Sequence, residues 1–475
     1  MTSYKVHYFD FRARAEAIRF LLSYGGVNFD DIRFEEDVWP KIKPTMPFGK
    51  VPVLEIDGER YSHTIAICSY LGEKFNLAGS NEIEKLQIQT AALFIYDLIG
   101  KVEDITYYYK DSFGKEHYDK EIHKLINETI PTALSQFDTI VADNNGYFVN
   151  GKLTWVDLYF TSLTDYFQGL FTWAELKHDA NFVDKYENLK NLKDKVLAIE
   201  KIKNWVEKRP VTIQHIKRYK TKIECVRKED NTAYSHKYID SPHIAVYEHF
   251  KASHLVLCRR SCDIDLQKTV AMSYKINYFT FKGLGEPVRF MLAYGNVDFV
   301  DNRVEWEDWP NLKPTMPLGQ MPVLEADGEV FHHCIPICRF LGNKFNLVGD
   351  NALENYKIDS AAETVNELRG KIAMWYYFDK QVKDDKYEKL INEVMPFYFE
   401  KLEQAAAKND GHLALNKITW ADVYAIAVME YCNVLMGYDL IANYPSLKKI
   451  YEKVMAAEGV KKYIAARPED RIPSF

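Results

Sequence analysis

The chain has 475 residues, a net charge of −7 at neutral pH and a hydrophobic share of 47%. A chain of this length is expected to fold as several domains, because single hydrophobic cores stop growing well below it. The modest acidic balance argues against a nucleic-acid partner, and no apolar run has the length of a membrane span. We expect no signal peptide, and the seven scattered cysteines are typical of reduced thiols in the cytoplasm.

The first 80 residues alternate between strand and helix patterns. Strands are expected over residues 5–9, 31–34 and 53–56, and helices over 13–24 and 64–75. Gly25-Gly26 is typical of a helix end, and Asp57-Gly58 is typical of a hairpin turn. Residues 39–50 are expected to be irregular. Cys68 falls on the apolar side of its helix and is interpreted as a packing thiol. The order predicts an α/β domain over 1–80.

Only helical periodicity follows from about residue 82, which predicts an all-α bundle over 81–210. Inside it, Thr154 is followed three residues later by Asp157. A threonine and an acid at this spacing satisfy free N–H groups at a helix start, so the pair is interpreted as a folding device and not as chemistry. The same pair recurs as Thr419 and Asp422.

The chain contains an internal repeat. Residues 40–59 read PKIKPTMPFGKVPVLEIDGE, and residues 310–329 read PNLKPTMPLGQMPVLEADGE. Copies of this size are domains rather than solenoid units. We therefore predict a second α/β domain over 272–351 and a second all-α domain over 352–475, with Cys338 as a second packing thiol.

Residues 211–271 belong to neither copy. They hold more basic than acidic residues, and Met272 directly precedes the restart of the repeat. Two interpretations stay open: a true fusion linker, or two adjacent genes joined in error through non-coding sequence. The linker holds His249, His254, Cys258 and Cys262, whose spacing matches no zinc pattern, so no metal site is predicted.

Several motifs of the first copy form a specific set: Tyr8-Phe9 at the end of a strand, Trp39-Pro40, Lys43-Pro44, MPFGKVPVLE and SHTIAICSYL. Together they resemble the sigma class of cytosolic glutathione transferases, which includes the haematopoietic prostaglandin D synthases. The resemblance covers both copies nearly end to end. It implies two tandem modules, each a thioredoxin-like domain followed by an all-α helical bundle, with glutathione as co-substrate and no metal.

In this family a tyrosine at the end of the first strand binds the sulfur of glutathione through its hydroxyl. This tyrosine corresponds to Tyr8 in copy one and Tyr278 in copy two. A free thiol has a pKa of about 8.5, and a hydrogen-bond donor at the sulfur lowers it. Tyrosine at the same register in both copies favours this role over packing. Arg14 matches an arginine that supports the tyrosine in prostaglandin D synthase-like members; a solvated helix face is the other interpretation. Copy two has Leu284 there.

The resemblance also implies residues that bind the rest of glutathione. Its glycine carboxylate would bind Trp39, Lys43 and Lys50 in copy one, and Trp309, Lys313 and Gln320 in copy two. Its cysteinyl backbone would bind Val51 and Met321, each followed by a cis proline, Pro52 and Pro322.

The residues expected to bind the γ-glutamyl carboxylate differ from those of the family. The family usually has a Gln-Ser pair at the start of the next helix. Copy one has His63-Thr64, and copy two has His333-Cys334, whose thiol is a weak donor. An acid from a partner subunit usually reaches the γ-glutamyl amine, and Asp97 and Glu367 fit that place. The role needs paired modules, as an intrachain pseudo-dimer or a homodimer; a linker of this length reaches about 45 Å, enough for pairing within one chain.

Aromatic residues lie where the family lines its hydrophobic pocket: Phe9 and Phe279 with Tyr107-Tyr108-Tyr109 and Trp375-Tyr376-Tyr377. Aromatic stripes at helical spacing more often pack in a core, so no bundle residue is assigned a catalytic role. The sequence thus predicts a glutathione transferase acting on hydrophobic electrophiles, with peroxidase or prostaglandin isomerase side activity. The alternative is a non-catalytic relative of the same fold, either crystallin-like and structural or a ligand carrier.

Overall fold

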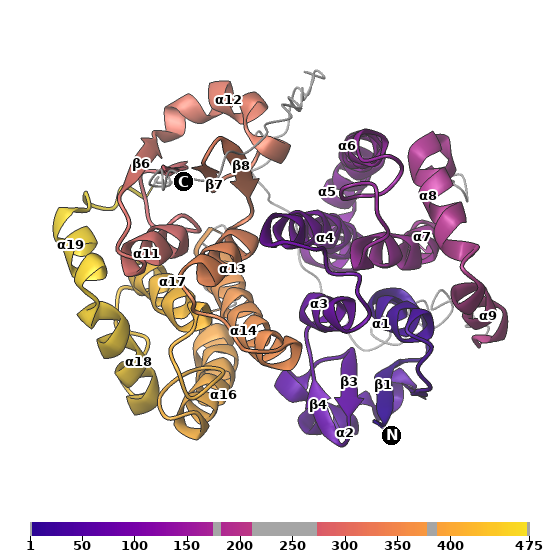
Figure 1. Ribbon diagram of the computed structural model, residues 1–475, viewed down its shortest axis with the longest axis horizontal. Coiled ribbons are helices and arrows are strands. Elements are labelled where there is room, and N and C mark those ends of the chain that lie inside the picture. Colours follow the sequence, from indigo (N-terminus) through magenta and orange to yellow (C-terminus); the bar gives the residue numbers. More distant parts are fainter. Residues whose placement is uncertain (1, 174–181, 211–272, 378–386, 473–475) are drawn as a thin grey trace, which may run out of the picture. The chain divides into compact units, whose positions relative to one another are not determined.

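The computed structural model describes residues 2–173, 182–210, 273–377 and 387–472, without the side chains of residues 107–115 and 168–173 and of Tyr377. The chain divides into two compact units, residues 1–238 and 239–475, and each contains one module (Figure 1). The predicted linker over 211–271, with Met272 and the His249, His254, Cys258 and Cys262 group, lies outside the described residues.

The first module begins with a four-stranded sheet of order β2-β1-β3-β4, formed by β1 (Tyr4–Phe9), β2 (Asp30–Phe34), β3 (Val53–Ile56) and β4 (Glu59–Tyr61). Strand β1 pairs parallel to β2 and antiparallel to β3, and β3 pairs antiparallel to β4. The expected hairpin is confirmed: Asp57 and Gly58 both have positive φ, 51° and 88°. Such a turn follows the twist of the two strands.

Helices α1 (Ala13–Tyr24) and α3 (Thr64–Lys74) lie between this sheet and the bundle (Figure 1). The end of α1 is as expected, with Gly25 N–H donating to Leu21 O at 2.9 Å. The region expected to be irregular instead forms short helical turns, among them α2 (Trp39–Ile42). Prolines cause this, because Pro40, Pro44 and Pro47 each stand in the first turn of one such segment, where no N–H is needed.

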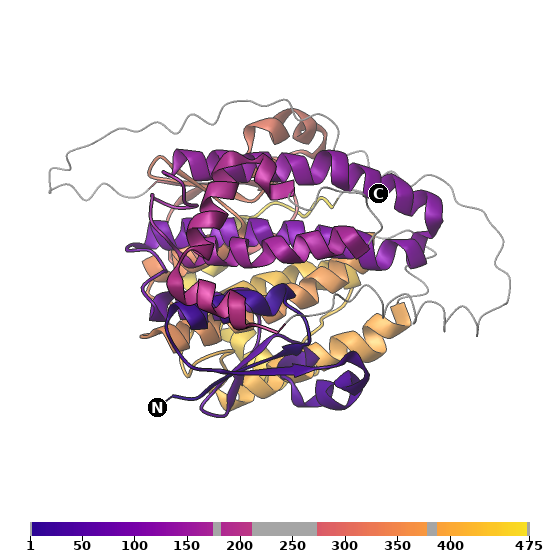
Figure 2. The ribbon, with the colours of Figure 1, turned by 90° about the vertical axis from the view of Figure 1, so that its right-hand side faces the viewer.

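The bundle of the first module contains α4 (Glu82–Glu103), α5 (Lys110–Lys124), α6 (Ile130–Asp143), α7 (Trp155–Trp173), α8 (Glu187–Leu197) and α9 (Glu200–Lys208). Its long helices run side by side, coloured purple to magenta in Figure 2. Helix α1 packs on α7, which joins the two domains of the module. The predicted packing thiol Cys68 is fully buried in α3, and burial raises its pKa.

The predicted helix cap at the start of α7 is confirmed. The Thr154 N–H and hydroxyl both donate to Asp157 Oδ2, at 2.6 and 2.9 Å, and the Phe148 N–H donates to Oδ1 at 2.9 Å. Asp157 is completely buried, and burial raises its pKa to about 6. The cap therefore links α7 to the loop before it.

The second module repeats this architecture. Its sheet has the order β6-β5-β7-β8, formed by β5 (Tyr274–Phe279), β6 (Phe299–Val304), β7 (Val323–Ala326) and β8 (Glu329–His332). Its described helices are α11 (Glu286–Tyr294), α12 (Trp309–Leu312), α13 (Cys334–Lys344), α14 (Ala352–Tyr377), α16 (Met395–Lys408), α17 (Trp420–Met436), α18 (Pro445–Ala456) and α19 (Glu458–Ala466). Cys338 is fully buried, as expected, and the cap of α17 repeats with Thr419 and Asp422. Over the described residues, no helix has the length and apolar character needed to cross a membrane.

Candidate functional site

The register of the first sheet brings several predicted residues to one edge. Because β3 is antiparallel to β1, the end of β1 at Tyr8 lies beside the start of β3, where the cis Val51-Pro52 bond is found. Strand β4 returns to the same edge, so His63-Thr64 follows it there. The cis bonds expected before Pro52 and Pro322 are both present.

Tyr8 is almost buried at this edge, with 5% of its surface exposed. Its ring packs edge-on against Phe11, with centroids 5.0 Å apart. Burial raises the pKa of the Tyr8 hydroxyl, and the Glu103 carboxylate raises it further, while the charge and the backbone N–H of Arg14 lower it. The net direction is upward, so the hydroxyl keeps its proton at neutral pH and can act as a hydrogen-bond donor.

Arg14, on α1, is held by an acid that sequence reasoning missed. Its Nε and Nη2 donate to the two carboxylate oxygens of Glu103, at 3.3 and 2.5 Å. Its guanidinium lies 4.5 Å over the Tyr96 ring, and the Tyr166 hydroxyl donates to Glu103 at 2.8 Å. Both charged side chains are about one-fifth exposed (20% and 19%). Arg14 is therefore an ion-pair member beside Tyr8 and not a solvated residue.

The predicted binders of a carboxylate lie along the short helical turns. Trp39 is half-buried, edge-on to Phe9 and stacked on Phe34, with centroids 5.3 and 5.8 Å apart. Lys43 is exposed, and its stem passes over Gly49, where an added Cβ would lie 3.3 Å from Lys43 Cε. Lys50 is partly exposed and directly precedes Val51-Pro52. Asp97 is half-buried and belongs to α4, in the bundle.

The start of α3 has an unusual backbone. His63 has a φ of 68°, which is rare for a residue with a side chain, and its ring lies 5.5 Å from Phe48. Thr64 is 6% exposed as the first residue of α3. Its hydroxyl and the first amides of the helix are thus brought to the sheet edge that carries Tyr8.

In the second module the tyrosine also has a backbone donor, as Tyr8 has from the Arg14 N–H, but it lacks the ion pair beside it. Tyr278 is 6% exposed, and the backbone N–H of Leu284 donates to its hydroxyl at 2.9 Å. Leu284 stands where copy one has Arg14, and Ala373 stands where it has Glu103, so the ion pair is replaced by two apolar residues. Trp309 is 7% exposed and edge-on to Phe279, while Lys313 and Gln320 are partly exposed beside Met321-Pro322.

The γ-glutamyl region of copy two departs further. His332 Nδ1 and His333 Nδ1 are 2.8 Å apart and share a hydrogen bond. Burial lowers the pKa of His332 to about 3, so this imidazole stays neutral at physiological pH. Cys334 is 6% exposed as the first residue of α13. Glu367, on α14, accepts a hydrogen bond from Tyr398 of its own bundle at 3.1 Å.

Sequence reasoning also missed two buried charged side chains next to the turn that follows β1. Arg19, fully buried in α1, bonds Asp31 Oδ1 at 2.8 Å and the Phe11 carbonyl at 3.1 Å, and it pairs with the buried Glu16. Arg289 and Glu286 repeat the pair in copy two. A signal existed, because a Glu and an Arg three residues apart recur at the same register inside an otherwise apolar helix. Glu103 gave no such signal, since copy two has Ala373.

The aromatic residues of the bundle are only partly described. The side chains of Tyr107, Tyr108, Tyr109 and Tyr377 lie outside the described residues. Trp375 and Tyr376 are half-exposed, and Trp375 lies 5.2 Å from the ring of Tyr387. Within the described ranges, no group of three or more His, Cys, Asp or Glu side chains could hold a metal ion.

Comparison with known proteins bears directly on this geometry. The N-terminal domain of glutathione S-transferase matches residues 4–73, and the C-terminal domain of the same family matches twice, over 103–209 and 366–467. A glutathione S-transferase of Anopheles gambiae is 50% identical over 196 residues, which is 41% of this chain and 97% of that protein. The chain belongs to the glutathione S-transferase family.

Other relatives of this transferase carry a more specific name. Hematopoietic prostaglandin D synthase of Gallus gallus is 35% identical, over 45% of this chain and 99% of that protein. The solved prostaglandin synthase D of Nilaparvata lugens is 40% identical, with a TM-score of 0.40, over 44% of this chain and 99% of that one. The two matches of the C-terminal domain confirm the tandem arrangement of the modules, and the names of the relatives confirm the resemblance to the sigma class; glutathione is the co-substrate of the family.

Proposed function

We propose that this transferase conjugates the thiolate of glutathione to hydrophobic electrophiles, chiefly at the first module. The observation that carries the proposal is the buried Tyr8 hydroxyl, which stays protonated because burial and Glu103 raise its pKa. A protonated phenol donates a hydrogen bond to sulfur and stabilises the anion over the thiol. The glutathione proton leaves to solvent, and the thiolate forms a C–S bond with the electrophile, either displacing halide from an aryl halide or adding to the C=C bond of an enal, which then takes up a proton.

The remaining residues at the sheet edge would hold the tripeptide. Trp39, Lys43 and Lys50 would bind its glycine carboxylate, and the backbone of Val51, before Pro52, its cysteinyl unit. His63, Thr64 and the amides of the α3 start would bind the γ-glutamyl carboxylate. In copy two these roles fall to Trp309, Lys313, Gln320, Met321 with Pro322, His333 and Cys334, alongside Tyr278. The neutral His332 and the thiol of Cys334 make this the weaker site.

Prostaglandin isomerisation is a second candidate, because relatives that match nearly over their full length are named hematopoietic prostaglandin D synthase and because Arg14 lies beside Tyr8. Peroxide reduction could use the same thiolate: its attack on the O–O bond releases an alcohol and leaves glutathione sulfenic acid, which a second glutathione converts to the disulfide and water. We also propose cytoplasmic action and domain limits of 1–80, 81–210, 272–351 and 352–475 joined by a fusion linker. A transcript that reads without interruption from residue 205 to residue 280 is expected, and separate transcripts would contradict the fusion.

Paired modules would let Asp97 and Glu367 reach the γ-glutamyl amine bound by the other module. We expect the 55.4 kDa chain to pair its own two modules and to give its monomer mass in native mass spectrometry. A strict dimer or larger assembly, with no single-chain species, would contradict intrachain pairing.

The function is tested by assaying the full-length chain with glutathione and a chromogenic aryl halide, alongside calorimetric titration with glutathione. We expect binding together with turnover that saturates in both substrates. Tight binding without turnover of aryl halides, enals, peroxides or prostaglandin endoperoxides would contradict the enzyme and favour a ligand carrier. Absence of binding would favour a structural, crystallin-like protein.

The Arg14–Glu103 pair gives a prediction for the first site. In a Tyr278→Phe background, Arg14→Leu should raise the pKa of bound glutathione by about one unit, because it leaves Glu103 as an uncompensated anion near the sulfur. Arg14→Leu combined with Glu103→Ala reproduces the residues of copy two and should return the pKa close to the parent value. The pH dependence of the ultraviolet absorbance of the bound thiolate measures both.

The double variant is the control that separates two roles of Arg14. If the pair acts as a neutral unit, removing both charges is nearly silent. If the double variant shows the same shift as Arg14→Leu alone, Arg14 acts directly on the thiolate and Glu103 only orients it.

A further inference from the structure

The turn that follows β5 in the second module places a backbone donor on Tyr278. Leu284 N–H donates to Tyr278 Oη at 2.9 Å. Gly283, just before it, has a φ of 43°, and a Cβ there would lie 2.4 Å from Tyr278 Oη. An N–H aimed at a phenol oxygen makes the phenol O–H a stronger donor. The position of the Leu284 amide therefore affects what Tyr278 can do to a sulfur.

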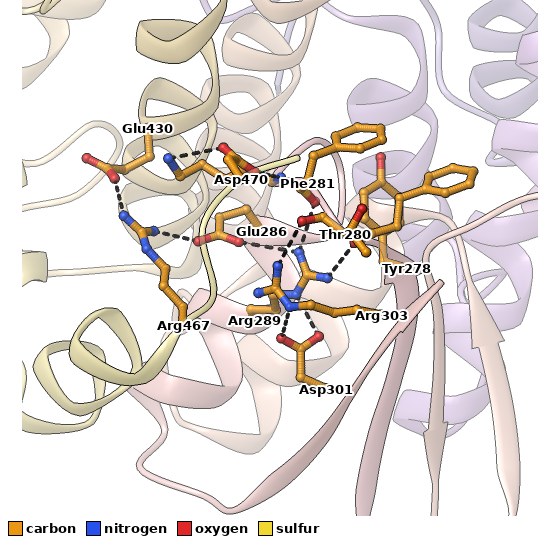
Figure 3. Close-up of polar contacts among 12 residues, drawn as sticks. Tyr278, Thr280, Phe281, Glu286, Arg289, Asp301, Arg303, Glu430, Arg467 and Asp470 are labelled. Carbon is orange, nitrogen blue, oxygen red and sulfur yellow. Dashed lines mark hydrogen bonds and ion pairs between the residues drawn. The ribbon is translucent and has the colours of Figure 1, made fainter. Parts of the chain in front are cut away.

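Charged side chains hold the backbone of this turn residue by residue (Figure 3). Arg289 donates to the carbonyls of Phe279 and Phe281, at 3.1 and 3.2 Å, and Arg303 donates to the Thr280 carbonyl at 3.2 Å. Both arginines belong to the α/β domain that carries the turn.

The next residue of the turn, Lys282, is bound by a side chain from the all-α domain of the same module. The Lys282 N–H donates to Asp470 Oδ1 at 2.6 Å, and the Lys282 ammonium lies 3.2 Å from Asp470 Oδ2. Asp470 belongs to the segment that follows α19, the last helix of the bundle. Both side chains are only 15% exposed, so solvent screens the pair weakly.

The segment that carries Asp470 is itself anchored close to the turn. Arg467 donates to Glu286 of α11 at 2.7 Å and to Glu430 of α17 at 2.8 Å, as Figure 3 shows. The α11 carboxylate is completely buried. Arg467 thus fixes the segment three residues before Asp470, which makes the carboxylate a defined partner for Lys282.

Copy one shares one of these contacts, from Arg19 to the Phe11 carbonyl at 3.1 Å, but the next residue of its turn has a different partner. Arg12 stands at the position of Lys282, and its guanidinium pairs with Asp165 of α7 at 2.7 Å, which Arg209 also contacts at 2.8 Å. The residue that corresponds to Asp470 is Thr212, which lies outside the described residues and has no carboxylate. The Asp470 contact is therefore particular to copy two.

We propose that Asp470 is a positioning residue for Tyr278. By holding the Lys282 amide it fixes Gly283 and keeps the Leu284 N–H on the phenol oxygen, so that Tyr278 stabilises a thiolate in a copy that has no counterpart of the Arg14–Glu103 pair. The proposal rests on the proposed function, in that copy two must bind glutathione as a thiolate.

The test uses the full-length chain with Tyr8→Phe, so that only the second site can activate the thiol. Calorimetry gives the Kd for glutathione, and thiolate absorbance against pH gives the pKa of the bound thiol. Asp470→Ala should raise that pKa by about one unit, a tenfold loss of thiolate below it, with little change in the Kd measured at a pH below the pKa of the bound thiol. Asp470→Asn keeps an acceptor oxygen for the Lys282 amide and should recover most of the shift.

Arg471→Ala is the matched control, since Arg471 is the next residue, its side chain is 74% exposed, and it pairs with the exposed Glu305 at 3.4 Å. It should leave the pKa unchanged. An unshifted pKa in Asp470→Ala, or an equal shift in Arg471→Ala, would overturn the proposal. Should Asp470→Ala not fold, a pKa in Asp470→Asn shifted by a full unit would equally overturn the role of the acceptor oxygen. If the Tyr8→Phe parent binds glutathione only as a thiol, copy two has no activating function and the proposal falls with it.

Discussion

Tyr8→Phe is expected to lower kcat/KM for aryl halide conjugation about 100-fold when measured in a Tyr278→Phe background. The phenol is almost buried and protonated, so its O–H is a fixed donor at the sulfur, and removal of one such donor typically costs about that factor. Phenylalanine keeps the packing against Phe11, so the fold should change little, as should the Kd for glutathione at a pH below the pKa of the bound thiol. Steady-state kinetics with a calorimetric Kd measure both quantities.

The matched control is the reverse background. Tyr278→Phe by itself should leave most of the activity of the chain, because the second site has His332, Cys334 and Leu284 where the first has Ser62, Thr64 and Arg14. If Tyr278→Phe alone abolished conjugation while Tyr8→Phe did not, the two modules would have been assigned in the wrong order.

Asp157→Ala is expected to lower the free energy of unfolding of the first module by about 2 kcal/mol at pH 7. The substitution leaves the buried N–H groups of Thr154 and Phe148 without their acceptor, which costs more than the relief of a buried charge returns. Denaturant unfolding followed by hydrogen exchange of α7 measures the effect. Asp422→Ala is the counterpart in the second module and should increase hydrogen exchange in α17 instead. If either variant lowered the protection of both modules equally, a local cap would be contradicted.

The same carboxyl should make stability depend on pH. Its folded pKa of about 6 lies above the ordinary value of about 3.9, so the folded state binds the proton more tightly than the unfolded state does. The raised pKa therefore contributes up to about 3 kcal/mol to the free energy of unfolding. This contribution is fully present below about pH 4 and is lost as the pH rises through about 6. Asp157→Asn cannot titrate, so the stability difference between wild type and variant should fall over that window. A constant difference would contradict the raised pKa.

Much of the fold could be predicted from the sequence because it depends on local patterns. The periods of apolar residues gave β1, α1, β3 and α3 within a residue or so of their observed limits, and Asp57-Gly58 identified the hairpin. The region over residues 39–50 was harder, since three prolines made short helical turns look irregular.

The amino-acid sequence by itself determined that two modules are present, that each has a tyrosine at the end of its first strand, and that the first copy keeps more of the family's polar residues. The partners of those residues depended on tertiary structure. Glu103 reaches Arg14 from the far end of α4, and Asp470 reaches the turn beside Tyr278 from beyond α19. Such charge pairs join residues that only folding brings together, and neither pair recurs in the other copy, so no spacing could reveal them.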